Sequence, residues 1–151
     1  MKKNSGFTLM EMMVVIAIIG ILAGIAIPNM ISWRSNHQLN SMAREIQAVI
    51  QGARLQAIKE NSRVTITFDT AAKEIKTSQI DRTQIAPPIE RTTNLRPGIS
   101  MTNNFTGNDI VYNNRGMLPD NIGGTVTITN LKGSQLQVIV APTGKPRIDK
   151  P

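Results

Sequence analysis

The most informative segment of the chain covers residues 6–33 and reads GFTLMEMMVVIAIIGILAGIAIPNMISW. After Glu11 this segment carries no charged residue, and about 20 apolar residues are enough for a helix to span a bilayer. An ordinary secretory signal has a shorter apolar core that is followed by a small-residue cleavage site. Here the small residue, Gly6, comes before the apolar stretch. Cleavage after Gly6 would remove the basic leader and leave the hydrophobic helix as the new N-terminus.

Glu11 is unusual, because it places a carboxylate at the start of an apolar helix. A charge placed deep in a bilayer costs on the order of 2.5–3.5 kcal/mol, so it needs a partner. Cleavage would create an amine on Phe7, one helical turn from Glu11. The partner amine can belong to the same chain or to a neighbouring subunit. A pair between subunits would favour assembly in one register.

The order of Gly6, Phe7, Glu11 and an apolar helix resembles the class III prepilin signal of type IV pilins and type II secretion pseudopilins. The resemblance implies a membrane prepilin peptidase that cuts between Gly6 and Phe7, methylation of the Phe7 amine, and Glu11 as the assembly residue. It also implies other pilin or pseudopilin subunits and inner-membrane lipid as partners. The basic leader favours a cytoplasmic N-terminus, which places the rest of the chain in the periplasm.

Gly20, Gly24 and Pro28 interrupt the apolar helix at four-residue intervals. Pro28 has no amide hydrogen, so the carbonyl of Gly24 loses its helical partner. We expect a kink or a flexible stretch between Gly20 and Pro28, and pilins similarly carry a helix-breaking proline here. An alternative is that Gly20 and Gly24 allow another helix to approach closely.

Beyond the membrane segment, the apolar residues follow a helical repeat and form one stripe of an amphipathic helix. The stripe consists of Leu39, Met42, Ala43, Ile46, Ile50, Ala53 and Ala57. The expected organisation is a leader at 1–6, a transmembrane and polymerisation helix at 7–33, an amphipathic helix at 34–61 and a β-rich head at 62–151.

The head shows short, threonine-rich segments that alternate in strand fashion and are separated by turns rich in Gly, Asn, Asp and Pro. The predicted strands cover 64–68, 74–80, 99–102, 110–112, 125–129 and 136–140. Short strands laid on the end of a helix predict an α+β fold: a long N-terminal helix packed on a small antiparallel sheet. The resemblance identifies this as the pilin fold.

Two segments of the head, 111–116 and 138–148, resemble the strand-turn-Gly and closing strand-Gly-basic patterns of the GspH/FimT branch, although Lys145 stands where that branch more often has Arg. The resemblance implies a minor pilin or minor pseudopilin that primes or caps a filament. A major pilin subunit is the alternative.

The chain has a formal net charge of +7 and a pI near 10.3. Some members of the branch are associated with DNA uptake through a basic C-terminal tail. Lys145, Arg147 and Lys150 predict a similar extended tail that reaches phosphates. The alternative is that these cations are simply a solvated surface, since no nucleic-acid motif accompanies them.

Composition argues against catalysis and metal binding. The chain has no cysteine and a single histidine, His37, which we interpret as a helix-surface residue. Residues 143–145 resemble the end of a phosphate-binding loop, but Pro146 replaces the Ser or Thr that binds magnesium. Asp120 and Asn121 supply too few oxygens for calcium and fit a turn. We therefore predict neither an enzyme nor a cofactor or metal site.

Overall fold

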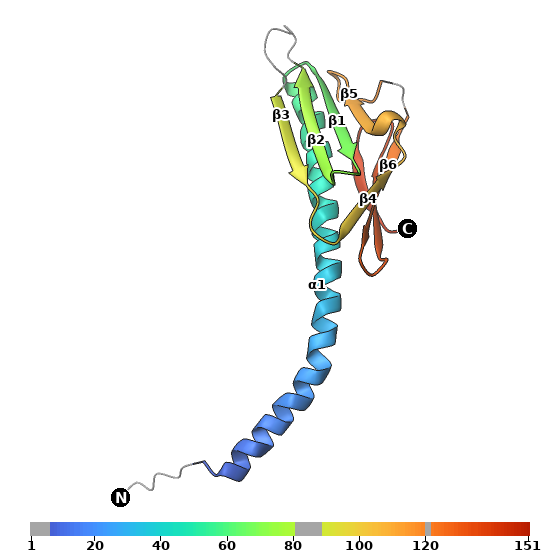
Figure 1. Cartoon of the computed structure of the whole chain (residues 1–151). Coiled ribbons are helices and arrows are strands. Elements are labelled where there is room, and N and C mark those ends of the chain that lie inside the picture. The colour runs from blue at the N-terminus through green and yellow to red at the C-terminus, as the bar shows by residue number, and fades with distance from the viewer. Residues whose placement is uncertain (1–6, 81–88, 120–121) are drawn as a thin grey trace, which may run out of the picture. The chain divides into compact units, whose positions relative to one another are not determined.

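The computed structural model describes residues 7–80, 89–119 and 122–151. The chain divides into two compact units, Met1–Arg34 and Ser35–Pro151. Among the described residues, one helix, α1 (Leu9–Lys59), passes through both units, and the second unit adds eight strands (Figure 1). The long N-terminal helix predicted from the sequence is therefore confirmed, with its first residue at Leu9.

Side-chain and backbone caps define both ends of α1. At the start, the hydroxyl of Thr8 accepts the amide hydrogen of Glu11 at 3.2 Å, which satisfies one of the free amides of the first turn. At the end, Asn61 adopts the left-handed conformation with φ 47°. The Ser62 amide then donates to the Ala57 carbonyl at 3.1 Å, and the Asn61 amide donates to the Ile58 carbonyl at 3.3 Å. These bonds form a Schellman motif that stops the helix before the first strand.

The strands form two antiparallel four-stranded sheets with the orders β3-β2-β1-β5 and β4-β6-β7-β8. The strands are β1 (Arg63–Asp69), β2 (Glu74–Ile80), β3 (Ile89–Asn94), β4 (Ile99–Asn103), β5 (Asp109–Tyr112), β6 (Gly124–Asn130), β7 (Gln135–Val140) and β8 (Pro146–Asp149). A short 3₁₀ turn, Thr106–Asn108, precedes β5. The α+β class is confirmed, and so are the six predicted strands.

The expectation of a single sheet was incomplete, because the strands divide between two sheets, and β3 and β8 were not predicted. Both are edge strands. Five of the six residues of β3 are exposed, so its sequence lacks the apolar alternation that marks a half-buried strand. β8 begins at Pro146, a residue that breaks strands except at their ends and edges.

The core of the head lies between α1 and the inner faces of the two sheets. Every residue of the predicted helix stripe is buried, from Leu39 to Ala57. The strands contribute alternating buried residues, as in β1 and β6. The largest fully buried side chains from the sheets are Tyr112, Phe68, Ile66, Ile75, Ile110 and Ile128. The interpretation of the stripe as head core is confirmed.

Candidate functional site

The N-terminal part of α1 is an apolar helix that the chain itself does not cover. Leu9–Ile27 has a mean hydropathy of 2.6, and none of it is buried within the chain. Its length and composition are sufficient to span a membrane. Apolar side chains that are exposed along a whole helix require lipid or other subunits around them. The predicted transmembrane segment, 7–33, includes this span.

Glu11 is the acidic residue in the first turn of α1. Its side chain is exposed, and no ion pair of Glu11 occurs among the described residues. Phe7 precedes the helix and is 78% exposed. Gly6 lies outside the described residues. The carboxylate therefore lies on the helix surface close to the residue that would carry a new amine after cleavage, and its pairing with that amine stays a prediction.

Gly20 and Gly24 leave an open strip on the surface of α1. A methyl group built on either glycine would meet no atom within 4 Å. The backbone at Pro28 is assigned to the helix, so α1 is continuous through the predicted flexible region. Both the flexibility and the close helix approach remain predictions.

Two glycine-containing turns of the head lie against α1. The segment 113–117 follows β5 and the segment 141–145 connects β7 to β8, and in each the glycine amide donates to a carbonyl three residues earlier at 2.8 Å. Gly116 has φ 69° and Gly144 has φ 80°, conformations that favour glycine. Arg54 of α1 donates from Nε to the Gly116 carbonyl at 2.9 Å. These turns are the two segments that resemble the GspH/FimT branch.

Tyr112 joins the same turns from inside the core. Its hydroxyl donates to the Gly144 carbonyl at 2.9 Å, and its side chain is fully buried. Burial raises the pKa of the Tyr112 phenol, and the nearby Arg54 guanidinium offsets part of that increase. We call Arg54, Tyr112, Gly116 and Gly144 the glycine-turn clasp. Sequence reasoning identified the two turns but not the helix residue and the tyrosine that join them.

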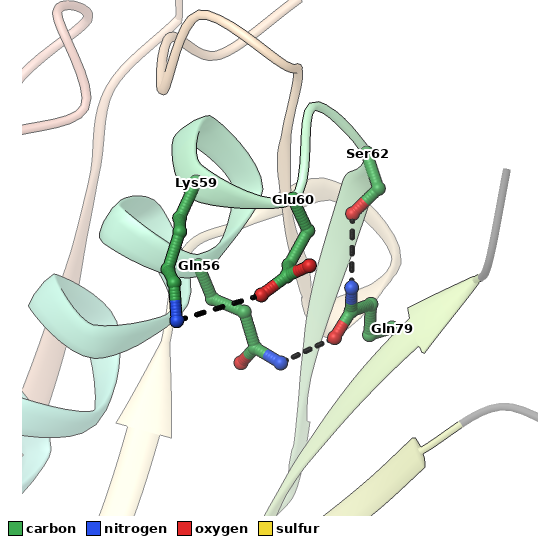
Figure 2. Close-up of polar contacts among 5 residues, drawn as sticks. All are labelled: Gln56, Lys59, Glu60, Ser62 and Gln79. Carbon is green, nitrogen blue, oxygen red and sulfur yellow. Dashed lines mark hydrogen bonds and ion pairs between the residues drawn. The ribbon is translucent and has the colours of Figure 1, made fainter.

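A second polar cluster connects the end of α1 to β2 (Figure 2). The Gln56 amide donates to Gln79 Oε1, and Gln79 Nε2 donates to the Ser62 hydroxyl at 3.2 Å. Gln79 and Ser62 are buried, so these bonds satisfy polar groups that would otherwise be costly. Lys59 and Glu60 form an exposed ion pair at 3.8 Å beside them. These bonds connect the C-terminal end of α1 to β2.

The basic C-terminal residues lie in and beside an edge strand. Pro146–Asp149 is β8, which pairs with β7 in the second sheet. Arg147 lies 3.7 Å from the Asp149 carboxylate, which neutralises part of its charge. Lys145 and Lys150 flank the strand and are exposed. The strand is held by its antiparallel pairing with β7, which runs from Gln137 opposite Asp149 to Val140 opposite Pro146. DNA contact by these three cations stays a prediction.

The described residues hold no group of three or more His, Cys, Asp or Glu side chains that is suited to a metal. His37 lies on an exposed position of α1 and takes part in an interaction there. Asp120 and Asn121 lie outside the described residues.

Two regions of the chain match known protein families. Residues 1–27 match the prokaryotic N-terminal methylation motif, and residues 42–144 match the type II transport protein GspH. Over 47 residues the chain is 47% identical to the type IV major pilin protein PilA of Myxococcus xanthus, covering 31% of this chain and 21% of that protein. Over 64 residues it is 42% identical to a fimbrial protein of Pseudomonas aeruginosa, covering 42% and 41%. The chain thus spans less than half the length of these relatives.

Solved structures share the fold at low sequence identity. The type IV minor pilin FimU of Pseudomonas aeruginosa superposes with a TM-score of 0.62 at 18% identity, covering 79% of this chain and 92% of that one. The minor pseudopilin EpsH from the type 2 secretion system of Vibrio cholerae gives a TM-score of 0.61 at 13% identity, covering 76% and 98%. An exposed apolar helix that continues into a two-sheet head defines a pilin-like subunit. Because the match at 42–144 covers more than half of the chain, the protein belongs to the GspH family.

Proposed function

We propose that this protein is a minor pilin or pseudopilin, a membrane-anchored structural subunit that assembles into or primes a type IV pilus or a type II secretion pseudopilus. The observation that carries the proposal is the apolar span Leu9–Ile27, which is not buried within the chain, lies inside the methylation-motif match at 1–27 and precedes a GspH head. A helix of this kind is stable only in lipid or against other helices. A filament core of such helices supplies the second environment.

Maturation begins with cleavage between Gly6 and Phe7 by a prepilin peptidase, followed by methylation of the Phe7 amine. Thr8 supports this order of events, because its hydroxyl caps α1 and leaves Phe7 outside the helix. Proteases bind extended substrates more readily than helical ones, since a helix hides its own backbone groups. Lys2 and Lys3 keep the leader on the cytoplasmic side, and the head lies in the periplasm.

Glu11 then directs assembly. In the membrane its carboxylate pairs with the amine on Phe7, because an unpaired charge among apolar side chains is costly. The amine of a neighbouring subunit satisfies the same requirement at one register only. The register that forms this pair is favoured over others in which both charges lose their partners.

A minor subunit is favoured over a major one because the head matches the GspH family, and both structural neighbours described above are minor subunits. The DNA-uptake alternative gains no support from the C-terminal residues, since Arg147 lies in a paired strand and beside Asp149.

The first test is the intact mass and N-terminal residue of the protein purified from its own membranes. We expect a chain that begins at N-methylated Phe7. An uncut chain that begins at Met1, in cells with active prepilin peptidase, would contradict the proposal.

The assembly role is tested with Glu11→Val, and with Glu11→Asp as the matched control. Glu11→Val removes the carboxylate, so we expect normal cleavage but loss of the subunit from sheared filaments. Glu11→Asp keeps the charge and should retain part of the incorporation. Normal incorporation of the Val variant would show that the carboxylate does not set the register.

A further inference from the structure

The turn between β6 and β7 exposes an apolar side chain to an unusual degree. Leu131 is 87% exposed, the largest value among the exposed large hydrophobic side chains of the described residues. The other side chains above 70% exposure are Phe7, just before α1, and Leu9, Met10 and Ile25 in its N-terminal part, all within the predicted membrane segment 7–33. Leu131 is thus exposed like a residue of the membrane helix although it belongs to the head.

The turn is held firmly in this conformation. The buried side chain of Asn130 accepts the amide hydrogens of Lys132 at 3.0 Å and Ser134 at 2.9 Å. Gly133 has φ 80° and donates its amide to the Asn130 carbonyl at 3.0 Å. Asn side chains stabilise turns by such bonds to the backbone ahead of them. The exposure of Leu131 is therefore built into the turn and is not a property of a loose loop.

The turn lies beside the first residues of the second unit. Asn130 Nδ2 donates to Asn36 Oδ1 of α1 at 3.2 Å. Asn36 follows Trp33, the last residue of the predicted membrane segment, by about 5 Å at 1.5 Å per residue. At its other end the same hairpin leads into Gly144, which lies beside Arg54 of α1. Within the second unit the hairpin therefore runs from the level of Arg54 to the level of Asn36, two residues after the first unit ends, and Leu131 is at its tip.

The surroundings of the turn suit anionic headgroups. An open cleft of about 520 Å³ lies between α1, the turn and the C-terminal residues. Its lining includes Asn36, Asn40 and Lys150 and no acidic side chain. Lys132 adds a second cation beside Leu131. Lysine side chains that lie close to an anionic leaflet are attracted to its headgroups.

We propose that the β6–β7 turn is a second membrane contact of this protein, in which Leu131 enters the bilayer interface and Lys132 and Lys150 bind anionic phospholipid headgroups. The proposal rests on the membrane anchoring by α1 proposed above. A single membrane helix keeps the head close to the membrane, but it does not fix the rotation or the tilt of the head. A second contact fixes the face that the head presents to incoming subunits, and it must be released when the subunit leaves the membrane.

The test uses the full chain, one copy per lipid nanodisc, with nitroxide labels on single introduced cysteines. The chain contains no cysteine, so each label is unique. The probe is Ser134→Cys, which keeps Leu131 in place. Ile19→Cys reports on the membrane span, and Leu55→Cys, an exposed apolar position 22 residues beyond Trp33 on α1, reports on water. Accessibility to oxygen relative to a water-soluble nickel reagent measures the depth of each label.

We expect the label at 134 to show a higher oxygen-to-nickel ratio than the label at 55 in nanodiscs that contain phosphatidylglycerol. The difference should disappear with Leu131→Ser and decrease with Lys132→Gln. Equal ratios at 134 and 55 would overturn the proposal, and so would protection at 134 that requires two copies per nanodisc, because that would be a contact between subunits. A water-exposed label at 19 would instead refute the membrane anchoring itself.

Discussion

Gly144 is a residue at which both backbone conformation and space exclude a side chain. Its φ is 80°, and a methyl group built there would lie 2.4 Å from the Gly116 carbonyl oxygen and 2.7 Å from the Tyr112 ring. We expect Gly144→Ala to lower the free energy of unfolding by about 3 kcal/mol, since backbone strain and a steric clash act together.

Gly133→Ala is the matched control, because Gly133 has the same φ and a methyl group built there would meet no atom within 4 Å. Its cost should be about 1–2 kcal/mol, from backbone strain alone. Urea unfolding measures both, and equal losses would show that the clasp is not tightly packed.

Tyr112 makes stability depend on pH in the alkaline range. Burial raises the pKa of its phenol above the ordinary value, which is about 10 in an unfolded chain. The neutral phenol therefore stabilises the fold fully below pH ~10, and this contribution is lost as the pH rises towards the folded-state pKa. From this group we expect the free energy of unfolding to fall by about 1.4 kcal/mol per pH unit above pH ~10.

The control for this titration is Tyr112→Phe. It removes the ionisation and should flatten the alkaline dependence, at the cost of about 1–3 kcal/mol at neutral pH because the Gly144 carbonyl loses its donor. Tyr112 is the only tyrosine of the chain, so the tyrosinate absorbance reports on this site alone. A tyrosinate signal that appears near pH 10 without unfolding would contradict the predicted shift.

The elements that the sequence predicts are those whose side chains follow a repeat. The helix stripe and six strands bury alternate or helical positions, and the pattern reveals them directly. The edge strands β3 and β8 pack little apolar surface, so they exist through hydrogen bonds to β2 and β7 that no local pattern records. The glycine-turn clasp could not be predicted either, because the hydrogen bond between Arg54 and Gly116 joins residues 62 positions apart in the sequence. Glu11 and the cleavage motif, in contrast, are contiguous and could be identified from a short segment.

Within α1, the turn that ends at Pro28 is the place where the helix should open most readily. The carbonyl of Gly24 cannot receive an amide hydrogen from Pro28, so one backbone bond is missing from an otherwise continuous helix. In micelles we expect faster amide hydrogen exchange around this turn than over 9–19, and slower exchange there in Pro28→Ala. Gly20→Ala, which keeps the proline, should slow exchange much less. Uniform exchange along the span in the unmodified chain would argue against a flexible stretch.

The whole molecule combines two units with different stabilising environments. The buried hydrophobic side chains of the described residues begin at Leu39, within the second unit. The first unit exposes its apolar residues and depends on lipid or on neighbouring subunits. Under the proposed function, this division would let one chain leave the membrane for a filament without unfolding its head, because no buried hydrophobic residue of the described chain belongs to the membrane segment.

The division predicts that residues 35–151 fold alone. They retain every buried hydrophobic residue of the described chain and the bond between Asn36 and Asn130. Urea unfolding of this fragment should match that of the head in the full-length protein in detergent within about 0.5 kcal/mol. A fragment that starts at residue 47 loses four buried side chains, Leu39, Met42, Ala43 and Ile46. Since each large one contributes about 2–5 kcal/mol against a total stability of about 5–15, this fragment should show no cooperative transition. If 35–151 were as disordered as the shorter fragment, the head would depend on the membrane helix, and release from the membrane would have to be coupled to unfolding or to simultaneous capture by the filament.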